Sequence, residues 1–281
     1  KTLTESLAGN NITRIMGVMN GTCNYILTRM EDTGLAYEEI FEEANQLGFL
    51  EADPNLDVGG IDAAHKLVLL SSIAYGTQVD FNGAILEGIG RITIEDIKAA
   101  SEMGYRIKLL GVSSLSDSGL SQTMRPCLVP LTSPLAQLNG GTNMIIIEGD
   151  AVGQIVLRGA GAGEGPTASA VIADILDIAR GINIPVFGQP ANSLIKVPAI
   201  STSVENSFYL RLNLKDEAGI LAKVSAALAN VGISIDRIRQ EGHEKDAAPV
   251  IIVTHPTDRD TLNKAISEIE ETSAAIDPPV V

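Results

Sequence analysis

The sequence is short of cysteine, histidine and basic residues, and each shortage excludes a class of protein. Only two cysteines, Cys23 and Cys127, occur in 281 residues, which excludes a disulfide framework and favours a reducing, cytoplasmic setting. None of the three histidines lies four residues from another, so we expect no zinc site. The 20 bases face 35 acids, and the resulting net charge of −15 would repel a nucleic-acid backbone.

Long apolar runs are also missing, since none approaches the roughly 18 residues of a membrane span. The composition is that of a folding chain, with 45% apolar and 20% charged residues. At about 150 residues per domain, the length predicts two domains. We therefore expect a globular protein whose partners include neither membrane nor nucleic acid.

The patterns divide the chain into two folded regions and a connection. Residues 1–157 mix helices and strands without a strict βαβ alternation, which predicts an α+β fold. Residues 158–200 contain a glycine-rich turn, one helix and a stretch marked by proline and glycine. In residues 206–281 the apolar spacing predicts the order βαββαβ, a ferredoxin-like arrangement. Its strands are expected at 208–214, 233–239, 249–254 and 274–281, and its helices near 220–231 and 262–269.

Carboxylates are concentrated ahead of one lysine in the first region. The acidic residues before Lys66 are Glu51, Asp53, Asp57 and Asp62. A calcium loop is disfavoured, because Val58 stands where an EF-hand needs its turn glycine and Ala64 where it needs its bidentate glutamate.

Asp62 and Lys66 are four residues apart, so a helix places them on one face of its first turns. One interpretation is an exposed ion pair at a helix N-terminus, which contributes little to stability. In the other, Lys66 donates or accepts a proton and Asp62 orients it. Glu51 and Asp57 would then help to bind a cationic group such as a substrate ammonium. The spacing alone leaves both interpretations open.

The segment Gly17–Tyr25 predicts a helix that follows a tight turn at Asn20-Gly21, with Thr22 as its N-cap. It is either a well-capped helix start over 24–31 or a seat for a carboxylate or phosphate at a helix N-terminus.

The segment Gly159–Ala170 predicts a strand, a glycine loop and a helix with Pro166 in its first turn. Glu164 stands where the Rossmann fingerprint needs its third glycine, so this is not the main dinucleotide turn. The loop could still approach a nucleotide from the side.

Taken together, these segments resemble the homoserine dehydrogenase family. The runs that carry the resemblance are Gly17-x-x-Asn20-Gly21-Thr22-x-Asn24-Tyr25, Glu51-x-Asp53-Pro54-x-x-Asp57-x-x-Gly60-x-Asp62-Ala63-Ala64-x-Lys66 and Gly159-x-Gly161-Ala162-Gly163-x-x-Pro166-Thr167. Residues 206–281 resemble the amino-acid-sensing ACT domain through Asp216-Glu-Ala-Gly219-Ile-Leu221. The resemblance implies a mixed-sheet catalytic domain followed by a ferredoxin-like regulatory domain.

The resemblance also implies an activity, the NAD(P)-dependent interconversion of L-homoserine and L-aspartate 4-semialdehyde in threonine and methionine biosynthesis. Lys66 would be the catalytic acid/base. The substrate would be bound by Glu51, Asp62, Asp57, Gly21 and Thr22, and NADP or NAD would lie against Gly161 and Gly163. ACT domains usually pair, so a homodimer or homotetramer is implied. An amino-acid effector, expected to be threonine, would bind near Asp216, Gly219, Ile220, Leu221 and Asn230.

The family further implies a nucleotide-binding domain with a Gly-x-Gly-x-x-Gly turn ahead of Lys1, and this chain has no such turn. We therefore expect residues 158–200 to pack on that domain, most of the cofactor contacts to lie there, and these 281 residues to be inactive alone. The alternative hypothesis is a non-catalytic amino-acid sensor with a dimerisation scaffold. The missing turn favours it, and the carboxylates gathered before Lys66 disfavour it.

Overall fold

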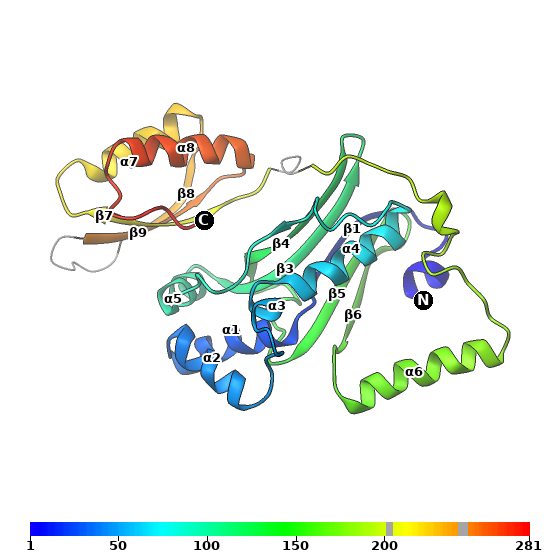
Figure 1. Cartoon of the computed structure of the whole chain (residues 1–281). Coiled ribbons are helices and arrows are strands. Elements are labelled where there is room, and N and C mark those ends of the chain that lie inside the picture. Colours follow the sequence, from blue (N-terminus) through cyan, green and yellow to red (C-terminus); the bar gives the residue numbers. More distant parts are fainter. Residues whose placement is uncertain (201–204, 241–246) are drawn as a thin grey trace. The chain divides into compact units, whose positions relative to one another are not determined.

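The computed structural model describes residues 1–200, 205–240 and 247–281 (Figure 1). They form two compact units, Lys1–Ile200 and Ser201–Val281. Among the described residues, none of the helices combines the length and the apolar character that crossing a bilayer requires. The α+β class expected from the sequence is confirmed in both units.

The first unit is built on a six-stranded sheet in the order β2-β4-β3-β1-β5-β6. Its strands are β1 (Ile12–Val18), β2 (Ile85–Leu86), β3 (Tyr105–Ser116), β4 (Gly119–Pro130), β5 (Thr142–Gly149) and β6 (Gly153–Ala160). β2 pairs with β4 in parallel and the other neighbours pair antiparallel, so the sheet is mixed.

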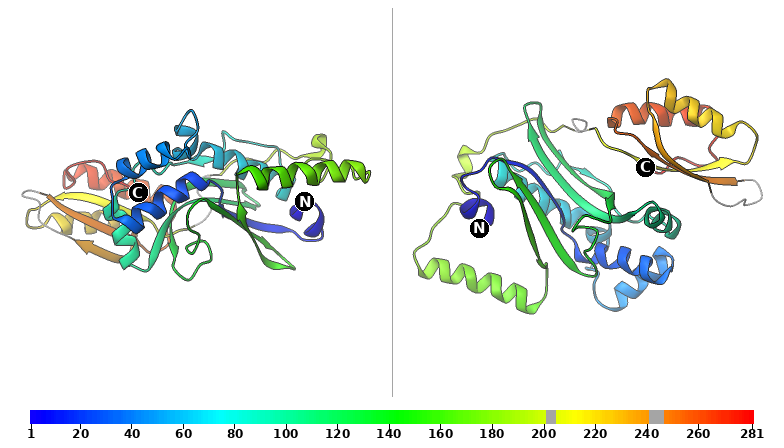
Figure 2. Two further views of the ribbon diagram at one scale, coloured as in Figure 1. Left: turned by 90° about the horizontal axis from the view of Figure 1, so that it is seen from below. Right: turned by 180° about the vertical axis from the view of Figure 1, so that it is seen from behind.

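Helices lie mainly on one side of this sheet (Figure 2, left). They are α1 (Gly21–Thr33), α2 (Tyr37–Gln46), α3 (Asn55–Val58), α4 (Ile61–Tyr75), α5 (Ile94–Glu102) and α6 (Glu164–Ala179), with a π-helical turn at Thr2–Ser6 and a 3-10 turn at Ala191–Ser193. α6 differs from the other α-helices of this unit, because none of its residues is buried.

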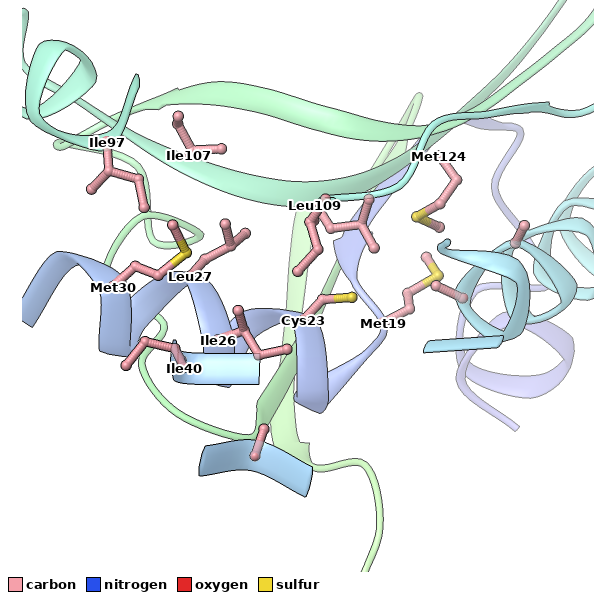
Figure 3. Close-up of a cluster of buried hydrophobic side chains, with 14 of the residues drawn as sticks. Met19, Cys23, Ile26, Leu27, Met30, Ile40, Ile97, Ile107, Leu109 and Met124 are labelled. Atoms are coloured by element: carbon pink, nitrogen blue, oxygen red, sulfur yellow. The ribbon is translucent and has the colours of Figure 1, made fainter. Parts of the chain in front are cut away.

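The two faces of the sheet carry separate cores, because successive side chains of a strand point to opposite faces. Leu109 points to the helices and belongs to one buried cluster with Cys23, Ile26 and Leu27 of α1 (Figure 3). Leu110 points the other way, into a smaller core that the loop 131–141 closes with Leu135, Ala136 and Leu138. α1 and α4 are therefore fixed against the sheet, with their N-termini at the same end of β1.

The second unit has a three-stranded antiparallel sheet in the order β7-β9-β8, with both helices contributing to one core. Its elements are β7 (Tyr209–Lys215), α7 (Ile220–Asn230), β8 (Ile235–Gln240), β9 (Ala247–Thr254) and α8 (Arg259–Glu271).

The sixth predicted element of this unit, a strand at 274–281, is only partly formed. The segment touches β7 through isolated bridges at Ala275 and Val280. Pro278 and Pro279 lie between the bridges, and proline has no N–H to donate to a ladder. A continuous strand was therefore the wrong expectation, although the segment runs antiparallel beside β7 as a ferredoxin-like order requires.

Candidate active site

The first turns of α4 bring Asp62 and Lys66 together. Gly60 precedes the helix with φ 78°, a left-handed conformation that glycine adopts without strain. The Lys66 Nζ lies 2.6 Å from the Asp62 Oδ2 and 3.2 Å from the Met19 carbonyl oxygen. The side chains are 47% and 41% exposed, so the pair is open to a ligand on one side. Two of the three Nζ–H bonds are thus directed, and the third remains for a ligand.

Asn20 connects α1 to the acidic segment. Its Oδ1 accepts from the Cys23 N–H at 2.8 Å, so Asn20 is the N-cap of α1 and the expectation of Thr22 was wrong. Its Nδ2 donates to the Asp57 Oδ1 at 2.9 Å and lies 3.5 Å from the Asp62 Oδ2. The side-chain amide can cap α1 and bind Asp57 at once, because its oxygen accepts a hydrogen bond while its nitrogen donates one.

Asp57 is buried and sets the path of the chain before α3. Its Oδ2 accepts from the Glu51 backbone N–H at 3.0 Å. The Thr22 hydroxyl donates to the Phe49 carbonyl at 2.9 Å, and the Phe49 ring stacks on Tyr25. The backbone at Glu51 is therefore held by Asp57 on one side and, through Phe49, by Thr22 on the other. In the described part of the chain the Glu51 carboxylate itself has no hydrogen bond or ion pair and is exposed.

Gly21 lies directly against the loop that closes the second core. A Cβ at Gly21 would stand 2.7 Å from the Gly141 carbonyl oxygen, so only glycine lets α1 begin here. Asn24 anchors the same loop, since its Nδ2 donates to the Leu138 and Gly140 carbonyls. These contacts hold the loop against the first turn of α1.

Lys108 of β3 binds the same loop and Asn24, and its role was not predicted from the sequence. Its Nζ donates to the Leu138 carbonyl at 2.6 Å and to the Asn24 Oδ1 at 2.8 Å. The side chain is 1% exposed, and burial lowers the pKa of Lys108 to about 8. The one available signal was a lysine within the otherwise apolar run 107–112 of a strand.

The glycine loop approaches the lysine site from the end of β6. Gly163 has φ 115°, which favours glycine, and the residues from Gly159 to Gly163 carry no side chain beyond Cβ. Gly161 faces Asn143 of β5, and the Asn143 Nδ2 donates to the Met19 carbonyl at 3.3 Å. Asn143 thus lies between the glycine loop and the Met19 carbonyl that Lys66 binds.

The predicted effector residues do not converge within one copy of the second unit. Gly219, with φ 88°, precedes α7, and Ile220 and Leu221 form its first turn beside Asp216. Asn230 ends the same helix and donates to the Glu268 Oε2 at 3.1 Å. An 11-residue helix separates its ends by about 15 Å, so one small effector could touch both groups only across two copies.

Comparison with known proteins matches this arrangement to a known family. The family profile described as homoserine dehydrogenase matches residues 1–176, and the profile of the ACT domain matches residues 208–273. The chain belongs to the homoserine dehydrogenase family. It is 41% identical over 278 residues to a homoserine dehydrogenase of Neisseria gonorrhoeae, covering 96% of this chain and 64% of that protein.

Solved structures of the family agree with the fold. The crystal structure of a homoserine dehydrogenase from Thiobacillus denitrificans superposes with a TM-score of 0.92 at 40% identity, over 100% of this chain and 65% of that one. A hyperthermophilic archaeal homoserine dehydrogenase in complex with NADPH has a TM-score of 0.56 at 30% identity, over 65% and 52%. The chain therefore spans about two thirds of the length of the Neisseria gonorrhoeae and Thiobacillus denitrificans proteins.

Proposed function

We propose that the complete protein is an NAD(P)-dependent homoserine dehydrogenase that interconverts L-homoserine and L-aspartate 4-semialdehyde in threonine and methionine biosynthesis. The observation that carries the proposal is the Lys66 ammonium, placed between the Asp62 carboxylate and the Met19 carbonyl beside the glycine loop. Family membership supports the same assignment.

The acidic segment would bind the amino acid. Asp62 and the unpaired Glu51 carboxylate suit its ammonium, and buried Asp57 maintains the chain that carries Glu51. Gly21 and Thr22, in the first turn of α1, would line the seat. Because Asp62 also binds the Lys66 Nζ, one carboxylate would orient both the substrate and the proton-transfer group.

Lys66 would move the proton of the substrate hydroxyl. In the oxidation of homoserine the neutral amine removes the O–H proton, and in the reduction of the aldehyde the ammonium returns it to the developing alkoxide. The Asp62 carboxylate and the Met19 carbonyl direct the Nζ lone pair or N–H toward the ligand side. A positive charge there also stabilises the negative oxygen that forms during reduction.

The residues of this chain fit a dinucleotide at the glycine loop, since Gly161 and Gly163 offer backbone without side chains at its exposed end. When bound, NADP or NAD supplies the hydride acceptor or donor. The exposed apolar side of α6 would be covered by the nucleotide-binding domain that the family implies. Its residues are Val171, Ile172, Ile175, Leu176 and Ile178.

The second unit would regulate this activity as an ACT domain. An amino acid, with threonine as the expected effector, would bind at the first turn of α7 near Asp216, Gly219, Ile220 and Leu221. Asn230 would come from a second copy, because it lies at the other end of α7. This arrangement supports a homodimer or homotetramer as the regulated form.

The proposal is tested by the absorbance of reduced cofactor in the complete protein. L-homoserine with NADP or NAD should give sustained turnover, and L-serine or L-threonine in its place should not. A protein that binds threonine calorimetrically but oxidises no homoserine with either cofactor would instead be an amino-acid sensor.

A further inference from the structure

The Met19 carbonyl at the end of β1 receives two side-chain donors. The Lys66 Nζ lies 3.2 Å from its oxygen and the Asn143 Nδ2 lies 3.3 Å from it. A carbonyl oxygen has two lone pairs, so both donors can bind at once. Lys66 comes from α4 and Asn143 from β5, so this single oxygen joins a helix to a distant strand.

Asn143 is placed there at a cost to the fold. Its Oδ1 is buried and has no hydrogen-bond partner among the described residues. An unpaired buried amide oxygen disfavours the folded state. The stability of β5 therefore does not account for an asparagine at this position.

Gly161 makes the space for this amide. A Cβ built on Gly161 would overlap the Asn143 Nδ2 and stand 2.8 Å from its Cγ. Gly161 has no positive φ that would demand glycine for backbone reasons. The missing side chain at Gly161 and the amide at Asn143 are thus complementary.

We propose that Asn143 is a positioning residue for Lys66, and that Gly161 is glycine because Asn143 occupies the space of its side chain. The Asn143 amide directs the Met19 carbonyl, and this carbonyl directs the Lys66 Nζ. The inference rests on the proposed dehydrogenase function, in which Lys66 moves the proton. It adds a second role for Gly161, beyond lying against the cofactor.

The inference is tested first with two variants of the complete protein. Asn143→Ala removes the donor, and Asn143→Asp keeps the shape but turns a carboxylate oxygen toward the Met19 carbonyl. Both should lower kcat by about tenfold or more, since a misplacement of about 1 Å can cost 10²-fold. The homoserine KM and the Kd of reduced cofactor, measured by its fluorescence, should stay within about twofold. Asn11→Ala, at an exposed amide near the other end of β1, is the matched control.

A double-mutant cycle then tests the role of Gly161. If Gly161→Ala acts by displacing Asn143, its effect on kcat should largely disappear in the Asn143→Ala background. If Gly161→Ala instead weakens cofactor binding equally in both backgrounds, that part of the inference is overturned.

The failures can be told apart. Wild-type protein without homoserine turnover would refute the proposed function. If the wild type is active, two results for Asn143→Asp would refute the positioning role alone. One is an unchanged kcat, and the other is a loss of activity that a weaker Kd of the cofactor explains entirely.

Discussion

Lys66 and Lys108 belong to the same unit, and the fold surrounds them in opposite ways. Lys66 is 47% exposed and has a carboxylate partner, whereas Lys108 is 1% exposed and donates to two neutral oxygens. A half-exposed ion pair adds little to stability, so Lys66 is free to serve a ligand. A buried ammonium without a bound carboxylate is expensive, so Lys108 affects stability directly.

Lys66→Ala should lower kcat for homoserine oxidation by about 10²-fold or more, the contribution of a positioned acid/base. The free energy of unfolding should hardly change, because the lost pair is half-exposed. Steady-state kinetics and urea unfolding measure the two effects. Lys98→Ala, at an exposed lysine of α5, serves as the control, and a near-normal rate in Lys66→Ala would contradict the assignment.

Lys108→Met should change the pH dependence of stability. Burial lowers the pKa of Lys108 from 10.5 to about 8, so between these values the unfolded chain binds more protons than the folded one. Stability from this group therefore rises with pH across that window. Urea unfolding at pH 8 and pH 10.5 should show a smaller rise in the variant than in the wild type. Parallel profiles would show that Lys108 is not the titrating group.

At the scale of elements, the starts of α1 and α4 show what local sequence can predict. The Asp62–Lys66 spacing placed both residues on one helix, and α4 (Ile61–Tyr75) confirms that helix. Thr22 was predicted to be the N-cap of α1, but the N-cap is Asn20. Both residue types cap helices well, and the choice depends on buried Asp57, which lies 37 residues away in sequence.

Asn20→Ala should remove the cap of α1 and leave Asp57 short of a donor, which lowers the free energy of unfolding by about 1–3 kcal/mol. It should also raise the homoserine KM, because Asp57 positions Glu51. Thr93→Ala removes the N-cap of α5 away from the site and should cost stability without changing KM. Chemical unfolding measures the stability of both variants, and steady-state kinetics measures their homoserine KM. An unchanged KM in Asn20→Ala would contradict a role of Asn20 in substrate binding.

Strands and long-range contacts were harder to predict than helices. The apolar spacing predicted α7 and α8 because a buried helix face repeats every three or four residues. It missed β4, where polar residues and Pro126 interrupt the apolar pattern. Asn143 and Lys108 were missed because their roles depend on sheet register, which brings β5 and β3 beside β1.

At the scale of the whole molecule, each unit has a core of its own. Leu67 belongs to the core of the first unit and Leu212 to that of the second, and both are 0% exposed. The two clusters share no residue. Each unit can therefore lose its packing without emptying the core of the other.

Calorimetry of the complete protein should accordingly show that Leu67→Ala and Leu212→Ala move different transitions. Each substitution should cost about 2–5 kcal/mol in its own unit, through lost burial and a cavity. Homoserine binding should survive in Leu212→Ala below its lowered transition. A single transition that both substitutions lower equally would show that the units unfold together.

The thiol of Cys23 offers a direct view of motion at the site. It is 0% exposed, donates to the Asp57 carbonyl at 3.1 Å, and burial raises its pKa, so a thiol reagent should reach it only when α1 separates from the acidic segment. In a Cys127→Ser background, which removes the other thiol of this chain, the labelling rate would measure how often α1 separates from the acidic segment. A substrate that bridges the two segments should slow the labelling, so that ligand binding can be followed without any catalytic turnover.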